Sequence, residues 1–355
     1  MREVEGALRS SHLTRGPRTR QFECYLADLL FRDDCVLFCN GTAAIYAAAR
    51  TFPFLPSRDG QKVFNRGRKG VPVEVGISDV TFLSVRSAVE RAGYGSHCLP
   101  VDKDTFCSDA SSFGLSGFGN AVICDLGGYV PDGEIAIEDA SHSLGGKDVG
   151  KNAKMVVGSL HAIKNLGIGE GGFAATDDKE QAESMRRIRD MGRGGEEDEL
   201  NYHPNELSCA LGLSRMARLN EEGAEKRGII EEYRERLDGF VSFQSWKGQE
   251  VNPHLCLVRS LPMPAPSAYL VERSFKRSGI QFIKHYKPLS LRGSSGRGEE
   301  GEELDESQWY WDDCFTLPMW VGMKKKEIDT VVEAVKSAQA MEVVSEYLPR
   351  RKKSA

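Results

Sequence analysis

Lys164 stands in a segment that could turn its amine into a nucleophile. Its neighbours His161, Ala162, Ile163 and Leu166 make this segment unusually apolar for a lysine. A lysine amine that is withdrawn from water has a lowered pKa, and the neutral amine can form a Schiff base with an aldehyde. A solvated surface lysine is the ordinary alternative. The apolar neighbours favour the reactive amine.

The glycines that follow this lysine allow a different interpretation. Gly167, Gly169 and Gly172 spell the pattern G-x-G-x-x-G, which in dinucleotide-binding proteins lies between a strand and a helix. Here the preceding apolar run ends near Leu160, well before the first glycine. The residues after the last glycine are too few for a helix and indicate a strand that runs into a turn. We therefore expect a close-packed glycine turn rather than a nucleotide site.

A possible phosphate site follows the apolar run at residues 35–39. Asn40, Gly41 and Thr42 come next and open an alanine-rich segment with a helical pattern. Free N–H groups at the beginning of a helix, together with a threonine hydroxyl, can bind a phosphate. For this segment taken alone, a plain helix cap by Asn40 or Thr42 is the simpler interpretation.

Two more apolar runs end in residues that could do chemistry. Asp139 lies near the end of the run at residues 134–140, with Ser141 and His142 directly after it, and Ser159 lies near the end of the next run. A carboxylate in the position of Asp139 can cap a helix or pair with a buried cation. Both interpretations of Asp139 remain open from this segment alone.

Considered together, these residues predict one cofactor. Pyridoxal 5'-phosphate needs a phosphate cradle, an acid that faces its pyridine nitrogen, and a lysine for its aldehyde. The sequence places residues 40–42, Asp139 and Lys164 at the ends of successive predicted strands. We therefore predict a pyridoxal-phosphate site at these strand ends.

The elements that must position these residues alternate between strand and helix. Strands are predicted at residues 35–39, 71–78, 119–126, 134–140 and 154–160, and helices at 40–51 and 81–93. This alternation favours a mainly parallel sheet with helices on both faces. Ligands of such α/β folds bind beyond the carboxyl ends of the strands, where the candidate residues lie.

The last third of the chain has the pattern of a second, smaller α/β unit. Helices are predicted at residues 221–238, 267–279 and 324–341, and strands at 253–258 and 280–284. We place the boundary near residue 225, with a large domain at 1–225 and a small C-terminal domain at 226–355. The polar stretches 57–70 and 290–307 look irregular, and the second has the low complexity of a mobile loop.

Composition excludes several classes of protein. The 355 residues include 47 basic and 52 acidic side chains that are well mixed, which argues against a nucleic-acid surface. No apolar run is long enough to span a membrane, and the N-terminus lacks the apolar core of a secretory signal. The nine cysteines have no regular spacing, which favours a reducing compartment and argues against a metal site. We expect a soluble cytoplasmic protein.

Nearly the whole chain resembles the DegT/StrS sugar aminotransferases, a family of fold type I pyridoxal-phosphate enzymes. The resemblance is carried by the motifs GPRTRQFECYLADLL, NGTAAIYAAA, DVTFLSVRSAVERAG, IEDASHSLGG, SLHAIKNLGIGEGG, NYHPNELSCALGLSRMARLN, HYKPLS and LPMWVGMKKKEID. It implies an α/β fold in which a large domain with a mainly parallel sheet binds the cofactor and a smaller α/β domain follows.

The resemblance also implies roles for individual residues. Lys164 would form the imine with the cofactor and then carry the proton of the 1,3 shift, and Asp139 would keep the pyridine nitrogen protonated. The other implied cofactor contacts are His142 beside the phenolic oxygen, Phe82 on the ring face, and Gly41, Thr42 and Ser159 at the phosphate. For Phe82, a plain core phenylalanine is the alternative.

Partners and substrates follow from the same resemblance. Asn201 matches an asparagine that reaches the phosphate from the neighbouring subunit, which implies a homodimer with shared active sites. His285 and Tyr286 fall in a segment that borders the substrate pocket. Glutamate would be the amino donor and a nucleotide-linked keto sugar the acceptor, in amino-sugar biosynthesis.

Some residues depart from the usual pattern of the family. The segment before Thr81 lacks the usual proline and aromatic residues, and Met191 and His203 stand where a histidine and an arginine are common. These departures concern the substrate side, so a cyclitol or another cyclic ketone is the alternative acceptor.

Two further functions are conceivable for such a chain. The sugar dehydratase branch of the family has a histidine in place of Lys164, so the lysine argues against it. A non-catalytic relative should have lost cofactor residues, whereas Lys164, Asp139 and Thr42 are all present. The transaminase is therefore the function that the sequence predicts.

Overall fold

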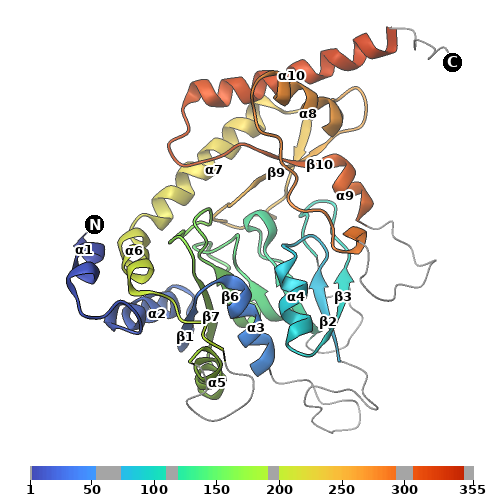
Figure 1. Ribbon diagram of the computed structural model, residues 1–355. Helices are drawn as coiled ribbons and strands as arrows, with labels where there is room; N and C mark the ends of the chain where they lie inside the picture. Colours follow the sequence, from blue (N-terminus) through green and yellow to red (C-terminus); the bar gives the residue numbers. More distant parts are fainter. Residues whose placement is uncertain (1, 53–72, 109–118, 191–199, 293–306, 348–355) are drawn as a thin grey trace, which may run out of the picture.

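The computed structural model describes residues 2–52, 73–108, 119–190, 200–292 and 307–347 (Figure 1). The irregular stretch predicted at 57–70 lies outside the described residues, as do Met191 and residues 293–306 of the predicted loop. The beginning of that loop forms a short 3-10 helix, Ser290–Arg292.

A seven-stranded sheet forms the centre of the larger unit. Its strands lie in the order β1-β7-β6-β5-β4-β2-β3, and only β7 runs antiparallel to the others. The strands are β1 (Asp34–Phe38), β2 (Glu74–Ser78), β3 (Gly95–Leu99), β4 (Gly119–Cys124), β5 (Ile135–Asp139), β6 (Ala153–Ser159) and β7 (Gly172–Thr176). The predicted mainly parallel sheet is confirmed.

Helices cover both faces of this sheet because alternate residues of a strand point in opposite directions. In β1, Val36 and Phe38 pack in the core beneath one set of helices, whereas Cys35 and Leu37 pack beneath the other. The first set is α3 (Gly41–Thr51), α4 (Ser84–Arg91) and α5 (Lys179–Arg189), and the second is α2 (Pro17–Leu29) and α6 (Glu206–Met216). A short N-terminal helix, α1 (Arg2–Arg9), lies beside α6 (Figure 1).

The smaller unit is built on a three-stranded antiparallel sheet in the order β10-β9-β8. Its elements are α7 (Leu219–Arg236), β8 (Val241–Phe243), β9 (Cys256–Ser260), α8 (Ala268–Arg277), α9 (Gln308–Asp313), β10 (Cys314–Leu317) and α10 (Lys325–Tyr347). Buried side chains of α7, α8 and α10 share one core with this sheet. In Figure 1, α7 runs from the larger unit up to the smaller one. The domain boundary that we predict near residue 225 falls within α7 and stays a prediction.

The strand predicted at residues 280–284 is wrong. Only Ile283 pairs, in an isolated bridge to Thr316 of β10. The chain then continues to the large sheet, where Leu289 N–H donates to Asp79 O at 2.8 Å. None of the helices in the described part of the chain is both long enough and apolar enough to cross a membrane.

Candidate active site

Parallel strands bring the residues predicted from sequence to one edge of the large sheet. Asp139 ends β5, Ser159 ends β6, and Asn40 lies just after β1. These three strands run in the same direction, so their carboxyl ends meet at one edge. Open α/β sheets bind their ligands beyond this edge.

Lys164 belongs to a tight turn between β6 and β7. Ala162 N–H donates to Gly169 O at 2.8 Å, which closes the turn. Gly169 has a φ of 93°, in the left-handed region that favours glycine. Gly172 begins strand β7 rather than a helix, so the dinucleotide interpretation fails and the close-packed turn is confirmed.

Burial changes the charge balance of Lys164 and Asp139. Withdrawal from water lowers the pKa of the Lys164 amine, and the charge of Asp139 opposes part of this effect. Burial raises the pKa of Asp139, while a hydrogen bond from Ser141 and the charge of Lys164 lower it. An amine that loses its proton easily therefore lies within the field of a buried acid.

Ser141 fixes one oxygen of the Asp139 carboxylate. Its N–H and its hydroxyl donate to Asp139 Oδ1 at 3.1 and 2.5 Å, and its hydroxyl oxygen accepts from Ser159 N–H at 2.8 Å. This arrangement orients the carboxylate and leaves Oδ2 to accept a proton-bearing group of a ligand. A buried acid held in this way fits the pyridine nitrogen of pyridoxal phosphate.

Three histidines lie close enough to Lys164 for its charge to affect their pKa values. Burial is the main cause that lowers the pKa of His142, His254 and His285, and the positive charge of Lys164 lowers each of them further. The pKa of His285 falls to about 4. These imidazoles are therefore neutral near pH 7.

His142 is held between two partners. Its Nδ1 accepts from Gly127 N–H at 3.4 Å, and its Nε2 lies 3.2 Å from the hydroxyl of Tyr286. The acceptor role of Nδ1 places the ring proton on Nε2, which then donates to Tyr286. The ring of His254 lies 4.5 Å from that of His142, between ring centroids.

The beginning of α3 forms the second part of the site. Asn40 Oδ1 caps the helix by accepting from Ala43 N–H at 2.8 Å, so the simple cap interpretation is correct. The cap leaves the N–H groups of Gly41 and Thr42 in the first turn of the helix, where Gly41 is buried and Thr42 is exposed. A Cβ on Gly41 would lie 2.9 Å from Ser159 Cβ, so only glycine allows the two segments to approach this closely. N–H groups at the beginning of a helix, beside Ser159, fit a phosphate group.

Phe82 lies on the surface of the site. Its side chain belongs to a residue that is 59% exposed, which excludes the alternative of a core phenylalanine. Its ring packs edge to face against Tyr286, with 5.9 Å between the centroids. An exposed ring next to Tyr286 is free to cover the face of a bound ligand.

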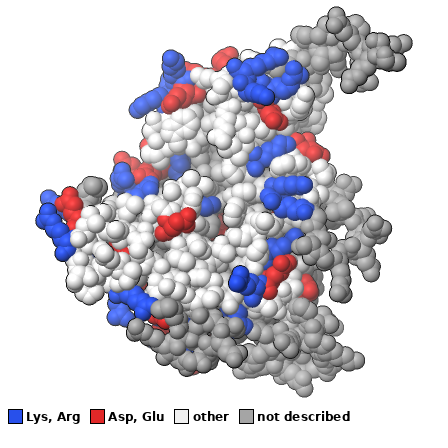
Figure 2. All heavy atoms as spheres, in the orientation of Figure 1, with Lys and Arg blue, Asp and Glu red and all other residues white. Residues whose placement is uncertain are grey.

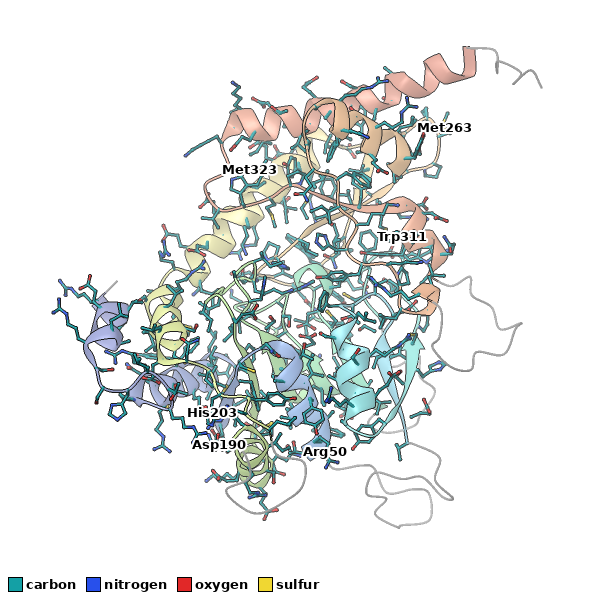
Figure 3. The ribbon with its side chains drawn as sticks, viewed as in Figure 1. Arg50, Asp190, His203, Met263, Trp311 and Met323 are labelled. Atoms are coloured by element: carbon teal, nitrogen blue, oxygen red, sulfur yellow. The ribbon has the colours of Figure 1, made fainter. Side chains whose placement is uncertain are left out.

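Asn201 lies on a segment beside the end of β1. It forms a bridge with Asp190, and the carbonyl of the next residue, Tyr202, accepts from Cys39 N–H at 2.8 Å. Figure 3 shows Asp190 and His203 side by side, and His203 Nε2 lies 3.2 Å from Asp190 Oδ1. The Asn201 residue itself is exposed, so its side chain is open to another molecule.

A cavity of about 530 Å³ is bordered by two of these histidines. Its walls include His254, His285 and Thr316, and the apolar side chains of Ile280 and Trp320. His285 Nδ1 is fixed 2.9 Å from Thr316 Oγ1. The volume is that of a small-molecule site, and none of the described residues that line it is a lysine or arginine.

Sequence reasoning did not identify His254 or the role of Ser141. His254 lies two residues before β9 of the smaller unit and reaches His142 through the packing of the two units, which no local pattern reports. For Ser141, the signal was its place between Asp139 and His142. Among the described residues, no group of three potential ligand side chains is placed to hold a metal ion.

Comparisons with known proteins show the family of this chain. The sequence matches the DegT/DnrJ/EryC1/StrS aminotransferase family over residues 1–113 and 133–336. It is 22% identical to the spore coat polysaccharide biosynthesis protein SpsC of Bacillus subtilis, over 95% of this chain and 93% of that protein.

Solved structures share the fold. The PLP-form of the putative sugar aminotransferase Spr1654 from Streptococcus pneumoniae has a TM-score of 0.80 and 20% identity, and covers 96% of this chain and 95% of its own. DesI, solved in the presence of its TDP-sugar product, has a TM-score of 0.82 and 21% identity, and covers 98% of this chain and 91% of its own.

Proposed function

The chain belongs to the DegT/DnrJ/EryC1/StrS aminotransferase family, and on that premise we propose that it transfers an amino group from glutamate to a keto sugar. Pyridoxal 5'-phosphate is the cofactor, and the acceptor would be a nucleotide-linked sugar of amino-sugar biosynthesis. The observation that carries the proposal is that a half-buried lysine, Lys164, and a buried aspartate, Asp139, lie close enough for each charge to affect the pKa of the other, at the edge of the sheet where ligands bind.

The residues that would hold the cofactor follow from the geometry. The N–H groups of Gly41 and Thr42 and the hydroxyl of Ser159 would bind the phosphate, and Asp139 Oδ2 would accept from the pyridine N–H. When bound, pyridoxal phosphate supplies an aldehyde for amines and a ring that withdraws electrons from the carbon under attack. Phe82 would cover one face of the ring.

The protein would supply the proton transfers and the orientation. Lys164 Nζ, with its lowered pKa, can accept a proton from the amino donor and return it to the neighbouring carbon position. Asp139 would keep the ring nitrogen protonated. His142 would lie beside the phenolic oxygen of the cofactor, with its Nε2 proton directed toward Tyr286, and its neutral state avoids repulsion with the Lys164 cation.

The acceptor would extend into the cavity beside His254 and His285. Apart from the carboxylate of Glu327, the walls are apolar or carry neutral polar groups, which suit the uncharged ring of a sugar or cyclitol. No lysine or arginine among the described lining residues could neutralise a diphosphate, so a nucleotide would leave the cavity toward other parts of the site. This cavity is consistent with either acceptor class.

We also infer that two subunits share the site. Asn201 is exposed beside the end of β1 and would reach the phosphate bound by the neighbouring subunit. Large apolar side chains are exposed in the N-terminal segment that contains α1 and α2: Leu8, Leu13, Tyr25 and Phe31. Figure 2 shows one face of the molecule, on which most charged side chains lie toward the margins and much of the middle is uncharged. An uncharged surface of this kind is typical of a subunit interface.

Borohydride reduction tests the role of Lys164. Reduction of the wild-type protein with pyridoxal phosphate should attach the cofactor to the peptide that contains Lys164. Lys164→Ala should abolish this attachment and lower turnover about 10³-fold or more, because no other amine is held there. Lys151→Ala, which removes an exposed lysine, should retain both. Transamination by Lys164→Ala at the wild-type rate would contradict the proposal.

The acceptor can be identified with protein that carries the amino form of the cofactor. Keto-sugar nucleotides, free keto sugars and cyclic ketones are added in turn, and the return of the aldehyde absorbance is followed. A response to the nucleotide-linked compounds alone supports the proposed substrate class. A response to free cyclitol ketones alone supports the alternative acceptor.

A further inference from the structure

A buried lysine on α7 reaches the residue next to Lys164. Lys226 is only 8% exposed, and its Nζ donates to Asn165 Oδ1 at 2.7 Å. Burial lowers the pKa of Lys226 to about 8. Lysine is among the side chains that are least often buried, so a buried lysine usually has a specific partner.

Asn165 is the centre of a hydrogen-bond network. Its Nδ2 donates to Asn252 O at 2.8 Å, and it also lies 3.4 and 3.5 Å from the carbonyl oxygens of His142 and Leu144. Asn252 Nδ2 donates to Leu144 O at 2.7 Å. The network therefore joins the Lys164 turn, the segment that carries His142, and the segment that leads into β9.

The network is packed too closely for water to replace the lysine amine. Asn165 and Asn252 are 6% and 1% exposed. A Cβ on Gly223, one turn before Lys226 on α7, would lie 2.5 Å from Asn252 Oδ1. Removal of the amine would leave Asn165 Oδ1 buried without a donor, which is costly for a polar atom. Asn165 would then turn, and the adjacent backbone of Lys164 would move with it.

We propose that Lys226 is a positioning residue of this active site, which fixes through Asn165 the direction in which the Lys164 side chain leaves its turn. The inference rests on the proposed role of Lys164. Reaction between an amine and a carbonyl carbon depends on their alignment, and a displacement of about 1 Å can cost about 10²-fold in rate. Because Lys226 lies on α7, the same bond links the smaller unit to the turn.

Three variants separate this role from general support by α7. Lys226→Met keeps most of the side-chain length but removes the donor, and Lys226→Arg keeps a donor. Arg227→Met is the matched control, because Arg227 is the next residue on the helix and donates to Val251 O at 2.8 Å without contacting Asn165.

Amide exchange of the full-length protein reports the turn without any need for activity. The N–H groups of Ala162 and Lys164 are hydrogen-bonded within the turn, to Gly169 O and His161 O. Lys226→Met should speed exchange in the peptide 160–169 about tenfold, because the turn loses its anchor. Arg227→Met should leave this exchange unchanged, and Lys226→Arg should restore at least part of the protection.

Kinetics then test the positioning role. Lys226→Met should lower kcat about tenfold or more, with less than about a threefold change in KM for glutamate, because alignment rather than binding is lost. Asn165→Leu should lower kcat in the same way. The kcat of the double variant should be no lower than that of the less active single variant, as expected for residues that act through one bond.

Two results would overturn the inference. One is unchanged exchange in Lys226→Met, and the other is a loss of kcat in Arg227→Met as large as in Lys226→Met. If exchange responds only in Lys226→Met while the wild-type protein does not transaminate, the bond between Lys226 and the turn is supported and the proposed function fails.

Discussion

At the scale of single residues, the site depends on burial that shifts the charge state of each group. Burial favours the neutral form of Lys164 and of Asp139, and the mutual attraction of their charges opposes this effect. Ser141 adds two hydrogen bonds that favour the carboxylate form of Asp139. These hydrogen bonds oppose the effect of burial and favour the charge that would stabilise a protonated ring nitrogen.

The variant Asp139→Asn tests this balance. The amide cannot hold a proton on the ring nitrogen, so kcat should fall about 10²-fold while the cofactor still binds through its phosphate contacts. Steady-state kinetics and the absorbance of bound cofactor measure the two effects separately. Asp132→Asn is the matched control, because Asp132 precedes the opposite end of β5 and is exposed. Equal turnover in the wild type and Asp139→Asn would refute the assignment.

At the scale of elements, α7 connects the two sheets and carries a buried charge in its middle. Burial is the main cause that lowers the pKa of Lys226, while Glu222 raises it and Arg215 and Arg227 lower it. Because the folded-state pKa of about 8 lies below the usual value of about 10.4, the unfolded chain binds more protons between these pH values.

Stability should therefore rise with pH in this window. The unfolding free energy of the wild type, relative to Lys226→Met, should increase by about 1 kcal/mol for each pH unit between pH 8 and 10. Below pH 8 this difference should be constant. Urea unfolding of both proteins at pH 7, 8, 9 and 10 measures it. A difference that is flat over the whole range would mean that Lys226 ionises as a solvated lysine does.

The elements could be predicted from sequence where their patterns were long. The apolar runs that became β1, β2, β4, β5 and β6 are bounded by turn residues, and the helical stripe of α7 is clear. The strands β8 and β10 have three and four residues, too few to show a period. Residues 280–284 have a strand-like composition, but only Ile283 pairs with β10. Pairing along β10 depends on tertiary contacts, which composition does not report.

The site could be predicted in part for the same reason. Asp139, Ser159 and Gly41 follow recognisable strands, and the topology of a parallel sheet brings such ends together. The contacts of Lys226 and His254 could not be predicted, because they depend on how α7 and β9 pack against the larger unit. Local sequence carries no record of that packing.

At the scale of the whole molecule, a shared active site makes a prediction about mixed dimers. Asn201→Ala and Lys164→Ala should each be nearly inactive, because one loses the phosphate contact and the other loses the amine. A mixed dimer would contain one intact site, in which Lys164 of one chain meets Asn201 of the other. Random exchange of subunits should restore about a quarter of the wild-type activity.

The mixture is prepared by mild dissociation and reassembly, and its size is checked by gel filtration. Mixing Lys164→Ala with wild-type protein controls for losses during reassembly. Mixed dimers that form but show no recovered activity would mean that each chain builds its own site. A monomer in all samples would contradict the proposed assembly.

The distribution of thiols offers a handle on this assembly. All nine cysteines are free, and Cys24 on α2 is exposed, whereas burial raises the pKa of the partly covered Cys39 and Cys98 thiols and so slows their reaction. A maleimide fluorophore should therefore attach first at Cys24, next to the exposed ring of Tyr25. Because Cys24 lies on the surface that we infer to be the subunit interface, it should be labelled faster in dissociated chains than in the assembled protein, and this difference in rate would report the association with no engineered cysteine.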